Sequence, residues 1–170
     1  MPYGGPIVAL PIRRGPRPAT TPTNPHTQLD QQPTDPDQRR LLAAELFALP
    51  GVVERPSRIS VPGARALWLE DGANGPTEAF MVGYEFAHLH PEPDQSLHAM
   101  LPPRLAGDAV EAGWAEVHPV ARMGLIPPNA VMLFAPRDDG EREVVASLVR
   151  ASYAFARGES LPPTAPSGRP

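Results

Sequence analysis

Three of the chain's five histidines lie within eleven positions, in the segment EFAHLHPEPDQSLHAM at residues 85–100. Imidazole titrates near neutral pH and binds transition metals, so rings at this spacing could serve acid–base chemistry or metal coordination. The chain has no cysteine, which excludes disulfides, thiolate nucleophiles and cysteine metal sites. A metal here would therefore have nitrogen and oxygen ligands, which zinc, copper, nickel and ferrous iron accept.

These histidines fall on two short segments that we expect to form a β-hairpin. Side chains alternate along a strand, so Phe86, His88 and His90 share one face of the first segment. With PEPDQ as a five-residue connection, His90 lies opposite Ser96, and His88 directly faces His98. One sheet face then presents three imidazoles, although a slip of one residue would remove His98 from it.

The hairpin leaves three alternatives open for the histidines. The first is a divalent metal held by His88, His90 and His98. The second is a pocket in which His88, His98 and Glu85 act as acid, base or hydrogen-bonding groups. The third is a solvated sheet face with no function, because strands carry exposed histidines freely.

Residues outside the hairpin histidines could complete a pocket. We expect His90, Arg58 and Trp68 to contact a substrate, since guanidinium groups bind anions and an indole can wall a cavity. Glu92 and Asp94 could orient a ring nitrogen, and His118 is a weaker candidate for a further site group.

The elements that must position these residues predict a single α+β domain. Asp35 and Pro36 begin a helix that Pro50-Gly51 ends, and further helices are expected over residues 102–114 and 138–158. Runs rich in β-forming residues predict strands at 57–61, 64–69, 77–83, 86–90, 96–101 and 130–136. The order α-β-β-β-β-β-α-β-α indicates a mainly antiparallel sheet with flanking helices.

Composition adds proline-rich tails to that domain. Twenty-five prolines and fourteen glycines accompany 41% apolar residues, which favours disordered ends around a globular middle. We therefore expect an N-terminal tail at 1–36, the domain at 37–158 and a disordered C-terminal tail at 159–170. The NPHTQLDQ piece of the first tail could instead dock through Leu29.

Charge and hydropathy bear on partners and location. A net charge of −4 gives no broad positive field, so we expect no nucleic-acid partner. No stretch approaches the about 18–20 apolar residues of a membrane span, so we expect no membrane partner and a cytoplasmic location. A small-molecule ligand is the expected partner, and the sequence leaves the oligomeric state open.

Several segments resemble a known family. RPSRISVPGARALWL, EAFMVGYEFAHLHPEPDQSLHAMLP, EAGWAEVHP and VVASLVRASYAFARG are similar to segments of actinobacterial luciferase-domain proteins, over residues 17–158. That family name implies an oxygen-dependent light reaction. ALPGV, the helix after LHAMLP and the closing LVRASYAF also resemble, more faintly, the double-wing proteins of the YjbR and MmcQ type, which implies a compact sheet with flanking helices.

Three functions follow as expectations. The first is a luciferase-family domain whose histidine-lined pocket binds or transforms a small organic molecule, with or without a metal. The second is a non-catalytic binding module of double-wing type. The third is an oxygen-dependent luciferase or oxygenase. The sequence does not decide between enzyme and binding protein, and it names no substrate.

Overall fold

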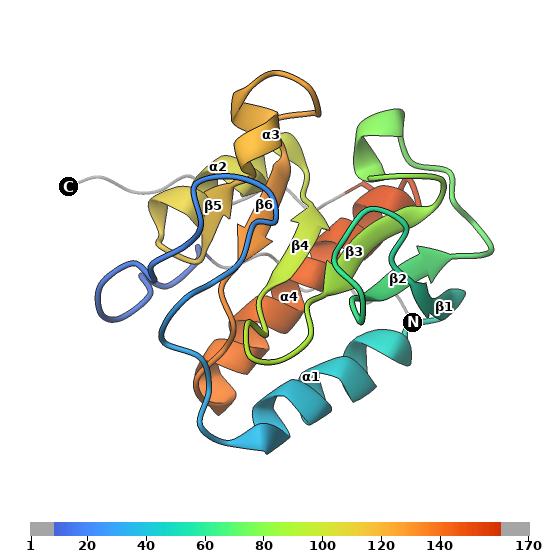
Figure 1. Cartoon of the computed structure of the whole chain (residues 1–170). Helices are drawn as coiled ribbons and strands as arrows, with labels where there is room; N and C mark the ends of the chain where they lie inside the picture. The colour runs from blue at the N-terminus through green and yellow to red at the C-terminus, as the bar shows by residue number, and fades with distance from the viewer. Residues whose placement is uncertain (1–8, 161–170) are drawn as a thin grey trace.

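A computed structural model describes residues 9–160, and the predictions for residues 1–8 and 161–170 fall outside this part of the chain. Within it, one six-stranded antiparallel sheet and four α-helices confirm the predicted single-domain α+β fold (Figure 1). The strands are β1 (Val52–Pro56), β2 (Arg65–Leu69), β3 (Glu85–Leu89), β4 (Leu97–Met100), β5 (Ala115–Val117) and β6 (Ala130–Leu133). The helices are α1 (Pro36–Phe47), α2 (Pro103–Glu111), α3 (Pro119–Arg122) and α4 (Asp139–Ala156), with the 3-10 turn η1 (Thr77–Ala79).

The sheet has the order β1-β2-β3-β4-β6-β5, which places the β3–β4 hairpin at its centre. Helix α4 packs on β3 and β4, and α1 packs beside α4. Leu97 and Ala99 of β4 are fully buried in the core, together with Val145 and Val149 of α4. Because strand side chains alternate, the opposite face of β4 is free to carry polar groups such as His98. Helices α1 and α4 thus cover one face of the sheet and leave the other for a site.

Some local elements differ from the sequence prediction. Residues 57–61 form a turn after β1, in which the Ser57 N–H donates to the Ala64 carbonyl at 3.0 Å. The run 77–83 contains η1 rather than a strand, and β1, the short β5 and α3 were not predicted. Strands of three residues carry too little alternation to be recognised from the sequence.

A β-bulge in β3 changes the faces of its first residues. Trp68 of β2 pairs with Glu85 and Leu67 pairs with Ala87, so Phe86 has no direct partner. A bulge adds one residue to a strand and turns the side chains beyond it. Phe86 therefore joins the core and packs on Tyr153 of α4, with ring centroids 6.1 Å apart. The prediction that Phe86 shares the histidine face was wrong, because simple alternation does not foresee a bulge.

Residues 9–35, which we call the N-terminal arm, lie along the domain. Figure 1 shows the arm in blue, passing near β5 and β6. Trp114 donates its indole N–H to the Pro11 carbonyl at 2.6 Å, and the side chain of Gln28 accepts from the Ala135 N–H at 2.9 Å. Leu29, the expected anchor, is 58% exposed. The arm thus docks through hydrogen bonds, and this differs from the mobile tail that its composition predicts.

Among residues 9–160, no helix combines the length and the apolar character that crossing a membrane requires.

Candidate functional site

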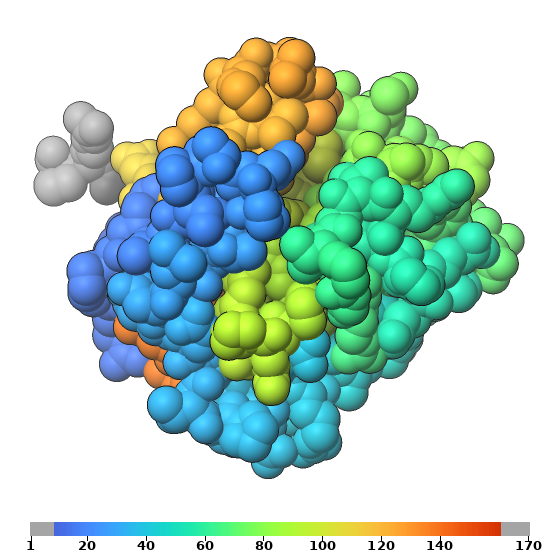
Figure 2. Space-filling model, viewed as in Figure 1, coloured from blue at the N-terminus to red at the C-terminus, as the bar shows by residue number. Residues whose placement is uncertain are grey.

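A cavity of about 590 Å³ opens on the sheet face away from α4. All five histidines of the chain line it, together with apolar side chains from several segments. Figure 2 shows a hollow on this face, bounded by the arm in blue, by the region of α3 in orange and by the loop after β1 in green. The non-histidine lining residues are Asn24, Pro25, Ile59, Ser60, Val61, Phe80, Met81, Met100, Val120, Ile126, Pro127, Ala130 and Val131.

The β3–β4 hairpin has the predicted register, with His88 paired directly to His98. Nε2 of His88 lies 3.1 Å from Nδ1 of His98, and both rings are buried. His90 lies beside them, with its ring centroid 4.5 Å from that of His98. The prediction that His88, His90 and His98 share one face is confirmed.

Glu85 supports His88 from within the sheet. Its Oε1 lies 2.9 Å from Nδ1 of His88 and also accepts from the Ser57 hydroxyl at 2.7 Å. Its Oε2 accepts from the backbone N–H of Arg58 at 3.3 Å. The bulge at Phe86 explains the contact, because it puts residues three apart, Glu85 and His88, on the same face.

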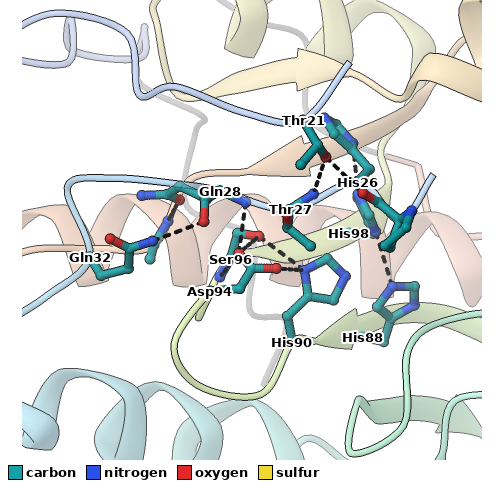
Figure 3. Close-up of polar contacts among 12 residues, drawn as sticks. Thr21, His26, Thr27, Gln28, Gln32, His88, His90, Asp94, Ser96 and His98 are labelled. Carbon is teal, nitrogen blue, oxygen red and sulfur yellow. Dashed lines mark hydrogen bonds and ion pairs between the residues drawn. The ribbon is translucent and has the colours of Figure 1, made fainter. Parts of the chain in front are cut away.

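His90 has a carboxylate partner of its own, Asp94 in the hairpin connection. Nδ1 of His90 lies 2.7 Å from Oδ2 of Asp94 and 3.0 Å from Oγ of Ser96 (Figure 3). Oδ1 of Asp94 accepts from the Ser96 hydroxyl at 2.6 Å and from the backbone N–H of Gln28 at 2.9 Å. The Asp94 carboxylate therefore links the hairpin to the arm.

The arm adds a histidine that the sequence analysis did not select. Nδ1 of His26 lies 3.0 Å from Nε2 of His98, and Nε2 of His26 lies 2.5 Å from Oε1 of Glu116 in β5. Thr20 of the arm donates to the same Glu116 oxygen at 2.7 Å. Glu85, His88, His98, His26 and Glu116 thus form a continuous row of side chains, which we call the histidine row.

His118 completes the cavity at the start of α3. Its Nδ1 accepts from the backbone N–H of Val120 at 3.1 Å and so caps that short helix. Its ring centroid lies 4.7 Å from that of His98. Burial, and after it the nearby imidazoles, lower the pKa of His118 to about 4.

The electrostatics of the site favour uncharged rings at His88, His98 and His118 and ionised carboxylates at Asp94 and Glu116. Burial holds the pKa of His98 well below its ordinary value, and the neighbouring histidines lower it further. Burial also lowers the pKa of His88, although the hydrogen bond with Glu85 opposes this. For Glu116, burial raises the pKa, but hydrogen bonds from His26 and Thr20 outweigh it and the net pKa is lowered. Asp94 is similar, since its bonds with His90 and Ser96 outweigh burial.

The cavity does not include every residue that the sequence analysis selected. Arg58 contributes its backbone N–H to Glu85, and it is exposed. The Arg55 guanidinium carbon lies over the Trp68 ring, 4.7 Å from the ring centroid. Trp68 also packs beside Tyr84. Neither Arg58 nor Trp68 lines the cavity. Their roles in substrate contact stay predictions.

Two groups of three histidines could hold a metal ion. The first is His88, His90 and His98, and the second is His26, His98 and His118. In each group the candidate ligand nitrogens lie within 4.8 Å of one another. His98 belongs to both groups. The same rings could instead serve as hydrogen-bonding or acid–base groups for a ligand in the cavity.

Comparison with known proteins adds family information to this geometry. Residues 83–152, which include both strands of the histidine hairpin, match the family model described as luciferase domain. The luciferase of Armillaria gallica is 30% identical over 165 residues, covering 86% of this chain and 60% of the fungal protein. The luciferase of Neonothopanus nambi is 34% identical over 73 residues, covering 42% of this chain and 27% of that protein. No solved structure matches significantly.

This chain therefore spans about 60% of the length of the Armillaria luciferases that it matches. The matches support the resemblance to luciferase-domain proteins. The actinobacterial origin and the resemblance to double-wing proteins stay predictions.

Proposed function

We propose that this chain, whose matches support membership of the luciferase-domain family, binds a small organic molecule in the histidine-lined cavity and transforms it there. One observation carries the proposal: all five histidines of the chain meet in a single cavity. His26 comes from the arm, His88 and His90 from β3 and its end, His98 from β4, and His118 from the residue before α3. Chance clustering along one strand therefore does not explain the arrangement.

The size and lining of the cavity suit such a ligand. A volume of about 590 Å³ lies within the range of about 300–1,000 Å³ that is typical of small-molecule sites. Ile59, Phe80, Met81 and Ile126 supply apolar walls, and the imidazoles supply the few polar groups. Apolar walls around a small polar cluster bind the body of an organic molecule and orient its polar group toward the cluster.

An oxygen-dependent luciferase reaction is the second candidate. The 30% identity to an Armillaria luciferase extends over 86% of this chain, well beyond the hairpin itself. Only 60% of the fungal protein is covered by this match. The light reaction is therefore a proposal for a domain, tested separately from ligand binding. No observation favours the double-wing binding module over either candidate.

The test of ligand binding uses a cavity-filling substitution with a matched control. Ser60→Trp places an indole in the cavity lining, whereas Ser147→Trp makes the same change on an exposed position of α4. The apolar dye 8-anilinonaphthalene-1-sulfonate serves as the probe, with fluorescence titration as the readout. We expect the parent and Ser147→Trp to bind alike and Ser60→Trp to bind at least about tenfold more weakly, since steric exclusion removes the apolar contacts. Equal binding by all three would contradict the proposal.

The light reaction has its own assay. A heat-treated extract of an Armillaria fungus serves as the source of candidate small molecules, and photon emission is recorded with oxygen present and with oxygen removed. Oxygen-dependent emission above that of heat-denatured protein supports the second candidate. Emission no greater than that of the denatured protein rejects the light reaction and leaves ligand binding to the dye experiment.

A further inference from the structure

We propose that His88, His90 and His98 bind one divalent transition-metal ion, through Nε2 of His88, Nε2 of His90 and Nδ1 of His98. The inference rests on the proposed function only in that the ion would lie in the same cavity. Imidazole nitrogens suit zinc, copper, nickel and ferrous iron, and three protein ligands leave a coordination position open.

The spacing of two of the nitrogen atoms is close to that of a metal site. Two imidazole nitrogens bound tetrahedrally at about 2.0–2.1 Å from a metal lie about 3.3–3.4 Å apart. Nε2 of His88 and Nδ1 of His98 are 3.1 Å apart, so a small rotation of either ring accommodates an ion. One ring nitrogen of His90 lies within 4.8 Å of a ligand nitrogen of each, and Nδ1 of His90 faces Ser96 and Asp94.

Each of the three rings has an outer partner on its second nitrogen. Glu85 lies at Nδ1 of His88, Asp94 lies at Nδ1 of His90, and His26 lies at Nε2 of His98. Metal-bound histidines almost always donate this second N–H to a carboxylate, carbonyl or water, which fixes the tautomer and the orientation of the ring. All three rings, which are buried, have a polar partner at this second nitrogen.

The number of hydrogens in the histidine row favours a cation. Four contacts join Glu85, His88, His98, His26 and Glu116 in sequence, and each hydrogen bond needs one hydrogen. A neutral imidazole carries one ring hydrogen, so three neutral imidazoles fill three of these four contacts. An ion between His88 and His98 replaces one contact, and the three hydrogens then fill the other three.

The second group of three histidines is the poorer ligand set. Nδ1 of His118 accepts from the backbone N–H of Val120, so the hydrogen of the neutral ring is on Nε2. Neither nitrogen of His118 then has a free lone pair unless the cap of α3 is broken. His90 differs, since its Nδ1 faces a carboxylate and its Nε2 lone pair is free. His90 and His118 therefore distinguish the two groups.

The experiment uses the full chain purified without a histidine tag and treated with EDTA. Zinc is titrated by calorimetry, and cobalt(II) is titrated by its visible absorption, which reports nitrogen ligation at a four-coordinate site. We expect one equivalent of either ion per chain. A folded protein that binds neither ion would overturn the inference.

His90→Ala and His118→Ala are the matched pair, because each removes one imidazole from the cavity. We expect His90→Ala to weaken zinc binding by at least about 100-fold, because loss of an outer partner alone costs about 10–100-fold and loss of a direct ligand should cost more. We expect His118→Ala to change zinc binding by less than about threefold. Near-UV circular dichroism checks the fold of each variant, and Glu85→Gln offers a second test, with an expected loss of about 10–100-fold, if His90→Ala does not fold. Loss with His118→Ala and retention with His90→Ala would refute the assignment.

The dye experiment on the EDTA-treated protein separates this inference from the proposed function. If the parent binds the dye more tightly than Ser60→Trp does but binds no metal, only the metal site is rejected. Metal binding with the expected His90 dependence, but without Ser60-dependent dye binding, rejects only the small-molecule cavity.

Discussion

Replacing Gln28 with alanine tests whether hydrogen bonds hold the arm on the domain. Gln28 is 2% exposed, its Oε1 accepts from the Ala135 N–H at 2.9 Å, and its Nε2 donates to the Asp30 carbonyl at 2.8 Å. Ala135 is itself buried, so the alanine variant leaves its N–H without a partner in the protein. The variant therefore removes a contact between the arm and the strand region rather than apolar surface.

The expected loss follows from the unpaired group. A buried donor left without a partner costs about 1–3 kcal/mol, so we expect the free energy of unfolding to fall by about 2 kcal/mol. For a chain of this size, each kcal/mol lowers the melting temperature by roughly 2–4 °C, which gives a decrease of about 4–8 °C. Gln32→Ala is the control, because Gln32 is half-buried and donates only one bond, to the Gln28 carbonyl at 2.9 Å.

Urea unfolding followed by tryptophan fluorescence measures this loss. Trp114 is a suitable reporter, since its indole N–H bonds to Pro11 of the arm. Limited proteolysis provides a second readout, and we expect faster cleavage between residues 9 and 35 in Gln28→Ala. If Gln28→Ala and Gln32→Ala unfold at the same urea concentration and are cleaved at the same rate, the hydrogen bonds of Gln28 do not hold the arm.

Three further changes test the sheet and its charges. Phe86→Ala should lower the free energy of unfolding by about 3–5 kcal/mol in urea titration, because Phe86 is fully buried in the core. Gly83→Ala should destabilise the protein by at least about 1–2 kcal/mol, measured in the same way, because Gly83 has a φ of +54° and an added Cβ would lie 2.5 Å from the Trp68 ring. Burial raises the pKa of Glu141, but hydrogen bonds from Arg137 outweigh it and the net pKa is lowered. The pair therefore stabilises the fold above the unfolded pKa of about 4.3 and loses this contribution as the pH falls through the folded pKa. Urea titrations at several pH values should show a weaker acid dependence for Glu141→Gln than for the parent.

The sequence predicts the hairpin well because its signals are local. Strand alternation and a five-residue connection suffice to place His88 opposite His98, as the structure has them. Asp35 likewise caps the first helix, since the capping residue and the helix start are neighbours in the chain. The same reasoning fails at Phe86, where one additional residue in β3 changes the face of the side chain.

The sequence predicts docking of the arm only as an alternative, through the wrong residue Leu29, because the docked segment has no periodic apolar signal. Its buried residues are Arg13, Pro18, His26 and Gln28, and three of the four are polar. A polar residue is buried when partners distant in the chain satisfy it, as Glu116 and His98 do for His26. The amino-acid composition does not indicate which distant residues will be those partners. His26 therefore enters the site through tertiary contacts that only the folded chain reveals.

Because the arm docks through polar contacts, the cavity wall that it forms should exchange between a closed state and an open state. Segments held mainly by hydrogen bonds open at lower free energy than the apolar core, so the arm should detach in some molecules while the sheet stays folded. Each opening withdraws His26 from His98 and admits water to the row of side chains. A ligand that contacts His26 binds only the closed form and must shift this equilibrium toward it. Ligand binding in the cavity would then increase the protection of the Thr27 and Gln28 amides from hydrogen exchange. Neither of these residues lines the cavity.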